Sequence, residues 1–252
     1  MGFKDHFSTQ AATYAAARPS YPPALFAFLA DQVMANNNAL DTALDVATGN
    51  GQAATGLAKH FRQVLACDAS QAQIDNATPV PNITFSCAPA DALPAADNSV
   101  DLVTVAQALH WFPLDAFYGE VRRVLKPGGL IATIAYGLHQ FDDPAIDRIM
   151  NHLYSEVLGA YWPSERFHIE QGYRSLAFPF ERLETPQFAM PAQWTLTSLE
   201  GYFTSWSATQ RYIKQHGENP IPKAMATIAD HWGQPDATRQ SNFPLFIQLG
   251  RV

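Results

Sequence analysis

Between about residue 41 and residue 136, short apolar runs alternate with stretches of helical character, and this alternation constrains the fold most. Five runs have the length and composition of strands: TALDVA, QVLACD, ITFSC, SVDLVTVA and GLIATIAY. The segments between them include the helical patterns QAATGLAKHF, SQAQIDNA and LDAFYGEVRRVL. Strands separated by helices pair in parallel and carry helices on both faces of the sheet. Because the apolar runs are continuous, we expect strands buried on both sides.

The segments outside this core predict a cover and a lid. Residues 1–38 form an N-terminal helical cover, in which Pro22 and Pro23 can open a helix. The apolar face of this helix includes Leu25, Phe26, Phe28 and Leu29.

Two further strands, near 181–189 and 243–250, complete a seven-stranded, mostly parallel, doubly wound sheet around the core of residues 39–136. Residues 137–242 include a helical lid before the last strand, which lies in residues 243–252. The interruption between the two added strands is long, and a segment of such length suits a substrate lid better than a plain connector. The sequence therefore predicts one α/β domain.

Composition narrows the classes of partner. Charged residues are 15% of the chain, and 16 Lys and Arg against 23 Asp and Glu give a net charge of −7. Such a chain lacks the basic face that binds nucleic acid or anionic membranes. No apolar run reaches the roughly 18 residues of a membrane span. We therefore expect a small-molecule partner, no nucleic acid and no membrane.

The two cysteines, Cys67 and Cys87, provide neither a disulfide framework nor a zinc-binding spacing. A reducing cytoplasm is accordingly the expected location. The histidines show no pair at a metal-ligand spacing, so we expect no metal.

The chemistry is densest in LDVATGNGQAA, which predicts a strand, a glycine turn and a helix. Small residues at Ala47, Gly49 and Gly51 let the backbone approach a ligand, and the helix presents free N–H groups at its start. Residues 49–54 also match the pattern G-x-G-x-x-A of dinucleotide-binding proteins. A tight turn required only for packing is the alternative.

Three carboxylates refine this interpretation. Asp45 lies inside the first strand, where its charge disfavours a pyrophosphate and favours a ligand ammonium group. Asp68 ends the second strand, where a carboxylate can accept both hydroxyls of a ribose in either nucleoside cofactor. Asp91 follows the third strand, where it can accept from an adenine amino group or lie in an exposed turn.

An ordered set of motifs resembles the class I S-adenosylmethionine-dependent methyltransferases, in the small-molecule subgroup similar to trans-aconitate methyltransferases. The motifs are LDVATGNGQ, LACDAS followed by QI, PADALPAADNSVDLVTVAQALHWF and EVRRVLKPGGLIA. The resemblance covers roughly residues 5–136 and includes the N-terminal QAATYAAARPSYP, whereas the last hundred residues match only loosely. One departure is Ala47, where many relatives have glycine.

The resemblance implies a Rossmann-like fold and a site for S-adenosyl-L-methionine at the carboxyl ends of the strands. Tyr14 and Arg18 would close over the cofactor, although Arg18 can equally be a solvated residue at a helix end. Gln107, His110 and Trp111 would border the methionine moiety and the transferred methyl group. The complete set implied around the cofactor is Tyr14, Arg18, Asp45, Ala47, Gly49, Gly51, Asp68, Ala69, Asp91, Ala92, Gln107, His110 and Trp111.

Methyl transfer from a sulfonium is an in-line displacement that needs neither an acid nor a metal. A carboxylate acceptor is already nucleophilic at neutral pH, whereas a hydroxyl or amine benefits from a base, for which His110 is the candidate catalytic residue. The alternative for His110 is a residue that shapes the pocket. Carboxylate and hydroxyl oxygens are the favoured acceptor atoms.

The lid contributes aromatic residues that suggest a flat or apolar acceptor as a group, although each alone is typical of a core. They are Tyr154, Trp162, Phe167, Trp194, Tyr202, Trp206 and Tyr212. Arg174 and Arg211 can bind a substrate carboxylate or remain solvated.

Two other function classes remain as alternatives. A nicotinamide-dependent oxidoreductase can use the same strand and turn, but Asp45 disfavours its pyrophosphate, and no Tyr-x-x-x-Lys pair is present. A non-catalytic nucleotide-binding module is the other alternative, and the long lid argues against it.

Overall fold

The structure, a computed structural model, describes residues 20–36 and 39–252. The strands are β1 (Thr42–Val46), β2 (Gln63–Asp68), β3 (Ile83–Cys87), β4 (Val100–Ala106), β5 (Leu125–Tyr136), β6 (Gln140–Phe141), β7 (Glu181–Leu183), β8 (Phe188–Trp194) and β9 (Arg239–Arg251). The α-helices are α2 (Pro23–Ala35), α3 (Gln52–Leu57), α4 (Gln71–Asp75), α5 (Leu114–Val124), α6 (Pro144–His152), α7 (Arg166–Glu170), α8 (Leu196–Thr204), α9 (Ser207–His216) and α10 (Ile221–Trp232). Three short helical turns are η1 (Leu109–Trp111), η2 (Leu153–Val157) and η3 (Gly159–Tyr161).

The strands form one sheet in the order β3-β2-β1-β4-β5-β9-β6, and β7 and β8 also pair with β9. Strands β1 to β5 are parallel, as the alternation of apolar runs and helical segments predicts. Strand β9 is antiparallel to all four of its partners. The predicted α/β fold is therefore confirmed, with the parallel strands confined to residues 42–136.

The described residues contain nine strands in this sheet, and the prediction of seven was therefore wrong in number. The predicted strand at 181–189 is two strands, separated by a break that contains Pro186, which has no N–H to donate to a ladder. Strand β9 begins at Arg239, earlier than predicted, and is 13 residues long. Its first half pairs with β6 and β8, and its second half pairs with β5 and β7, with some overlap. Each half of β9 therefore forms hydrogen bonds with two strands.

Helices cover both faces of the sheet. Helix α2 begins at Pro23, as predicted, and buries Leu25, Phe26 and Leu29 in a cluster with α3. Helix α5 and η1 contribute to a second cluster, which also takes side chains from β4 and β5. These two clusters produce the two-sided burial that the continuous apolar runs predict, and every residue of β4 before Ala106 is buried.

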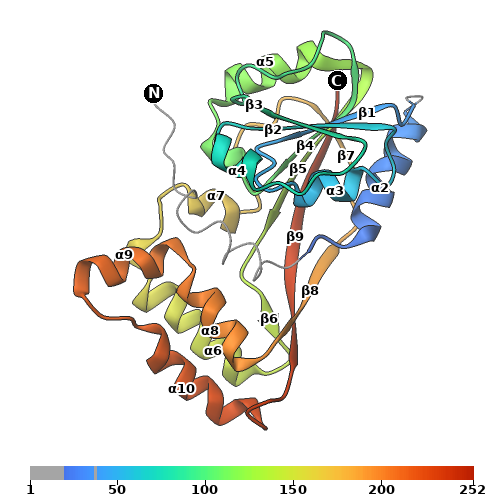
Figure 1. The fold of residues 1–252 in the computed structure, drawn as a ribbon. Helices are drawn as coiled ribbons and strands as arrows, with labels where there is room; N and C mark the ends of the chain where they lie inside the picture. The colour runs from blue at the N-terminus through green and yellow to red at the C-terminus, as the bar shows by residue number, and fades with distance from the viewer. Residues whose placement is uncertain (1–19, 37–38) are drawn as a thin grey trace.

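Helices α6, α8, α9 and α10 form a group beyond the sheet, and β6, β8 and β9 run between this group and the sheet (Figure 1). The predicted lid supplies α8, α9 and α10, whereas α6 comes from the segment before β7. Helix α10 contacts both α6 and α8. We call these four helices the helical group.

Candidate active site

The chain leaves two neighbouring strands through left-handed backbone. Ala47 follows β1 with a φ of 54°, and Gln107 follows β4 with a φ of 60°. Strands β1 and β4 are adjacent, and β2 lies on the other side of β1. The connections that leave β1 and β4 therefore diverge here, as at the topological switch point where open α/β sheets bind ligands. Gly49 and Gly51 continue the turn at φ values of 58° and 91°, which glycine adopts readily. At Ala47 the same conformation carries strain, because its Cβ crowds the backbone.

Asp45 is buried beneath this turn, with 1% of its surface exposed. The Thr48 hydroxyl donates to Oδ2 at 2.6 Å, and the Thr104 hydroxyl donates to Oδ1 at 2.7 Å. Burial raises the pKa of Asp45 to about 6, although these hydrogen bonds and one from the Ala54 N–H oppose the rise. The carboxylate therefore ties β1 to β4 and to the turn, a network whose two threonines sequence reasoning missed.

Asp68 lies at the end of β2 and points its carboxylate at the same turn. Its Oδ2 accepts from the N–H of Gly49 at 3.0 Å, and its Oδ1 accepts from the N–H of Ser70 at 2.9 Å. The structure thus brings Asp45, Gly49 and Asp68 together, as the motif order predicts. Ala69 follows directly.

Asp91 and Ala92 lie exposed in the loop between β3 and β4. The N–H of Ala92 donates to the carbonyl oxygen of Pro89 at 3.2 Å. An exposed turn was one of the two interpretations of Asp91, and its contact with an adenine stays a prediction.

Gln107 carries an unsatisfied acceptor. Its backbone N–H donates to the carbonyl oxygen of Ile134 at 2.8 Å, and its Nε2 donates to that of Tyr136 at 3.1 Å. Its Oε1 is buried and has no hydrogen-bond partner among the described residues. A buried acceptor left unpaired costs about 1–3 kcal/mol. A ligand with an N–H donor at this edge would remove that cost.

His110 and Trp111 lie in η1, next to the end of β4. The Nδ1 of His110 is 3.1 Å from the hydroxyl oxygen of Tyr173, and its ring centroid is 4.6 Å from that of Trp111. Burial lowers the pKa of His110 to about 3, and the positive charge of Arg166 lowers it further. A neutral imidazole with so low a pKa is a weak proton acceptor. These features favour the pocket-shaping alternative over a general base.

Tyr173, the partner of His110, is a residue that sequence reasoning missed. It is fully buried, and it has a φ of 60° directly after Gly172, whose φ is 57°. Burial also raises the pKa of its hydroxyl, so this group stays protonated at neutral pH. The glycine was the available sequence signal for a tight turn at this position.

The aromatic residues proposed for an acceptor pocket separate into two groups. Tyr154, Trp194, Tyr202 and Trp206 are buried in the cluster that fills the helical group, so they act there as packing residues. Trp162 and Tyr212 are half-buried, and Phe167 is 54% exposed.

Four cationic or phenolic candidates remain. Arg174 is exposed, and Arg211 donates to the carbonyl oxygen of Tyr161 at 3.2 Å, so neither is fixed toward a ligand in the way that a recognition residue would be. Tyr14 and Arg18 lie outside the described residues.

Over residues 20–36 and 39–252, no helix has the length and apolar character to cross a membrane. In the same part of the chain, no three or more His, Cys, Asp or Glu side chains gather as metal ligands would.

Comparisons with known proteins agree with the geometry of the strand ends. Residues 44–133 match the family described as methyltransferase domain. A Dictyostelium discoideum protein named as a methyltransferase is 30% identical over 254 residues, which cover 99% of this chain and 95% of that protein. A methyltransferase-like protein of Schizosaccharomyces pombe is 30% identical over 71% of this chain and 72% of its own. The solved structure of a type II methyltransferase from Anaeromyxobacter dehalogenans superposes with a TM-score of 0.87, at 39% identity, over 93% of this chain and 97% of its own.

Proposed function

This chain belongs to the class I S-adenosylmethionine-dependent methyltransferases, and from that premise we propose that it methylates an oxygen atom of a small-molecule acceptor. The observation that supports the cofactor part of this proposal is the unsatisfied Gln107 Oε1 in the segment that follows β4. The α-ammonium group of S-adenosylmethionine is a donor that would satisfy this acceptor. The residues present therefore fit the cofactor that the family uses.

Residues at different strand ends would contact different parts of the cofactor. Asp68 would accept the ribose hydroxyls while its other contacts hold the turn. Gly49 and Gly51 have no side chain in the way of the methionine part. Asp45 acts indirectly, because it is almost completely buried beneath the turn, where its oxygens accept from two threonine hydroxyls. The remaining assignments, to Asp91 and the other motif residues, follow from the family resemblance: Tyr14, Arg18, Ala47, Ala69, Ala92 and Trp111.

S-adenosylmethionine supplies a methyl group bonded to a sulfonium sulfur. The leaving group is a neutral thioether, so its departure needs no acid. The protein's contribution is to hold the acceptor oxygen in line with that methyl group and to exclude water, which can supply up to about 7–11 kcal/mol in well-oriented reactions. His110 and Tyr173, which contact each other, would form one wall of this space. Because the pKa of His110 is lowered to about 3, a carboxylate oxygen, which needs no base, is the acceptor atom that we favour.

The remaining assignments concern the setting of the reaction. The net charge of −7 supports a small molecule over nucleic acid as the acceptor. Both cysteines are unpaired thiols, which suits a reducing compartment such as the cytoplasm. The subgroup similar to trans-aconitate methyltransferases stays our hypothesis for the closest functional class.

Calorimetry with S-adenosylhomocysteine and with NADH tests the cofactor. We expect the wild-type protein to bind S-adenosylhomocysteine and not NADH. Asp68→Asn should weaken the affinity for S-adenosylhomocysteine by about 1–3 kcal/mol, since the ribose loses a charged acceptor. The exposed Asp75 on α4 accepts only from Gln71 in its own helix, so Asp75→Asn is the matched control. Binding of NADH alone would instead support the oxidoreductase alternative.

Mass spectrometry of acceptor mixtures incubated with protein and S-adenosylmethionine tests the reaction. We expect a gain of one methyl group on a carboxylic acid. Cofactor binding without methylation of any acid, alcohol or amine would favour the non-catalytic module.

A further inference from the structure

The hydroxyl of Tyr173 reaches His110 from a strained turn that follows α7. Gly172 and Tyr173 lie in succession in the left-handed region, with φ values of 57° and 60°. This conformation is rare outside glycine, and for a bulky aromatic residue it carries strain. A Cβ at Gly172 would lie 2.8 Å from Cγ of Phe246, so β9 packs directly against this turn. The surroundings therefore hold the strained turn, which places the Tyr173 hydroxyl oxygen 3.1 Å from His110 Nδ1.

The hydrogen bond between these two side chains has two possible orientations. Either the Tyr173 hydroxyl donates to Nδ1, or Nδ1–H donates to the hydroxyl oxygen. Tyr173 is fully buried, and the N–H of Leu109 donates to its oxygen. Among the described residues, His110 Nδ1 is the only acceptor that the hydroxyl proton meets. In the second orientation that proton would be a buried donor without a partner, so the first orientation has the lower free energy.

The first orientation fixes the tautomer of His110. Burial keeps the imidazole neutral, because it lowers the pKa to about 3, so the ring carries one proton at neutral pH. Since the lone pair of Nδ1 accepts from Tyr173, that proton lies on Nε2. His110 is half-buried, and its Nε2 has no hydrogen-bond partner in the part of the chain that the structure describes. The ring therefore presents one N–H donor to a ligand and no nitrogen that can take a proton from one.

We propose that Tyr173 is a positioning residue that holds the proton of His110 on Nε2, so that His110 donates a hydrogen bond to the carboxylate of the methyl acceptor. The inference rests on the proposed function and narrows its substrate class to acids that are already ionised.

A carboxylate uses its two oxygens differently in this arrangement. One oxygen accepts from Nε2–H, and the other attacks the methyl carbon. The new carbon–oxygen bond forms as the carbon–sulfur bond breaks, the electron pair of that bond stays on sulfur, and no proton is transferred. An alcohol or an amine would have to lose a proton, which neither ring nitrogen of His110 can take.

NMR spectroscopy of protein with isotope-labelled histidine, saturated with S-adenosylhomocysteine, tests the tautomer directly. Ring nitrogens with and without a proton resonate in separate regions, and the loss of signals in His110→Gln assigns them. We expect Nδ1 of His110 to lack a proton and Nε2 to carry one at neutral pH. In Tyr173→Phe, which removes only the hydroxyl group, both signals should move toward the average of the two tautomers.

Tyr118→Phe is the matched control for this experiment. Tyr118 is buried in the same cluster as Tyr173, and its hydroxyl donates to the carbonyl oxygen of Ala177 at 2.7 Å. The control should leave the signals of His110 unchanged. A proton on Nδ1 in the wild-type protein overturns the inference whether or not Tyr173→Phe folds. An unchanged tautomer in folded Tyr173→Phe overturns it as well.

Methyl-transfer rates separate the donor role from the proposed function. The substrate is the acid that gains a methyl group in the acceptor screen, at saturating S-adenosylmethionine. His110→Gln keeps an N–H donor, so its kcat/KM should stay about tenfold above that of His110→Leu, which has none. Equal losses in the two variants overturn the donor role. If no acid is methylated, the proposed function and the donor role both fail, whereas the NMR spectra still decide whether Tyr173 sets the tautomer.

Discussion

At the scale of single residues, His139 is the least typical side chain of the interior. It is fully buried, and its ring stacks on Phe243 with a centroid distance of 4.6 Å and an interplanar angle of 8°. Its Nδ1 lies 2.7 Å from the Ser241 hydroxyl, which accepts from Trp194 Nε1 at 2.8 Å. Its Nε2 has no partner among the described residues. Burial lowers the pKa of His139 to about 3, so the folded protein holds it neutral.

This burial predicts a loss of stability in acid. Below a pH of about 6.5 the unfolded chain takes up a proton at His139 and the folded chain does not, so the free energy of unfolding falls as the pH falls, until the pH approaches about 3. Relative to His139→Phe, the wild-type protein should lose up to about 1.4 kcal/mol per pH unit within this window. Urea unfolding at several pH values from 4 to 7 measures the difference.

A difference between two proteins is needed because other groups titrate in the same range. His110 contributes in the same direction as His139, and the raised pKa of Asp45 contributes in the opposite one, since its protonated form is favoured in the folded state. The contributions of His110 and Asp45 are the same in the wild-type protein and in His139→Phe, so they cancel in the difference between their unfolding free energies. The exposed His152→Phe serves as the control, and an equal slope in His139→Phe and wild type would contradict the prediction.

The sequence predicted the residues of the site better than their contacts. The sequence predicted that Gly49 and Asp68 lie at neighbouring strand ends, because their types and spacing along the chain carry that signal, and their roles toward a cofactor stay predictions. The partners of Asp45 and His110 were missed, because Thr104 and Tyr173 reach them through strand register and a distant turn. Such contacts depend on the fold, which spacing along one segment does not contain.

At the scale of elements, the packing of α2 on α3 depends on one glycine. A Cβ at Gly56 in α3 would lie 2.1 Å from Cε2 of Phe26 in α2. Phe26 is buried at this contact, and its ring also meets the ring of Tyr21 edge to face at 6.3 Å. The two helices therefore approach too closely for any side chain at this position.

Gly56→Ala should separate α2 from α3 and destabilise the protein by about 1–3 kcal/mol, as expected for overpacking. Gly201→Ala is the matched control, because Gly201 also lies inside a helix, and a Cβ there meets no atom within 4 Å. This control should stabilise the protein by about 0.5–1 kcal/mol, since alanine has the higher helix propensity. Urea denaturation compares the two variants, and equal effects would contradict the close approach of α2 and α3.

Strands were predictable from the sequence where their apolar pattern is clear. Strands β1 to β5 were found because buried parallel strands are continuous apolar runs. The division of residues 181–194 into β7 and β8 was missed, because β7 has only three residues and β8 alternates between exposed and more buried residues, so neither is a continuous apolar run. Strand β6 has two residues and is defined by its pairing with β9 alone.

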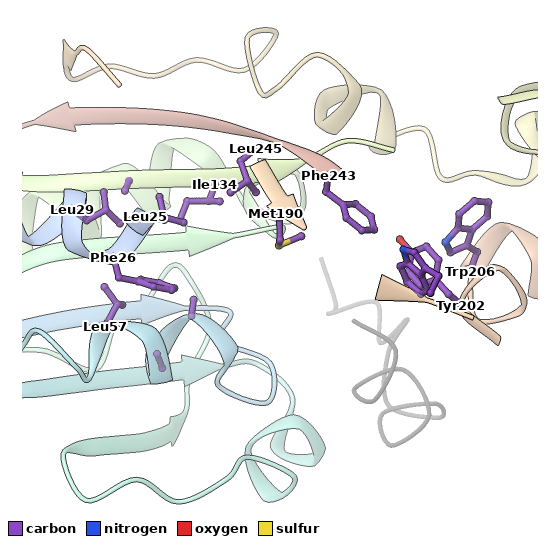
Figure 2. Close-up of a cluster of buried hydrophobic side chains, with 14 of the residues drawn as sticks. Leu25, Phe26, Leu29, Leu57, Ile134, Met190, Tyr202, Trp206, Phe243 and Leu245 are labelled. Atoms are coloured by element: carbon purple, nitrogen blue, oxygen red, sulfur yellow. The ribbon is translucent and has the colours of Figure 1, made fainter. Parts of the chain in front are cut away.

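At the scale of the whole molecule, one apolar cluster joins the sheet to the helical group. Figure 2 shows Leu25, Leu29 and Ile134 on the sheet side and Tyr202 and Trp206 on the side of α8, with further labelled side chains between them. Those intermediate residues are Met190, Phe243 and Leu245 on β8 and β9. Shared burial of this kind couples the two parts, so the prediction of a single domain becomes a prediction about unfolding.

We expect the sheet and the helical group to unfold in one transition. Four of the five tryptophans, all except Trp111, lie at or after residue 162, so their fluorescence in Trp111→Phe reports the helical group and its strands. Cys67 is fully buried in β2, so its reaction with a thiol reagent in Cys87→Ser reports the sheet. The urea midpoints from the two probes should coincide in a protein that carries both substitutions.

Met190→Ala removes a buried side chain from the connecting strands and should lower both midpoints together, by about 2–5 kcal/mol in unfolding free energy. A fluorescence change at lower urea than the exposure of Cys67 would show instead that the helical group unfolds by itself, and the single domain predicted from the sequence would then be wrong.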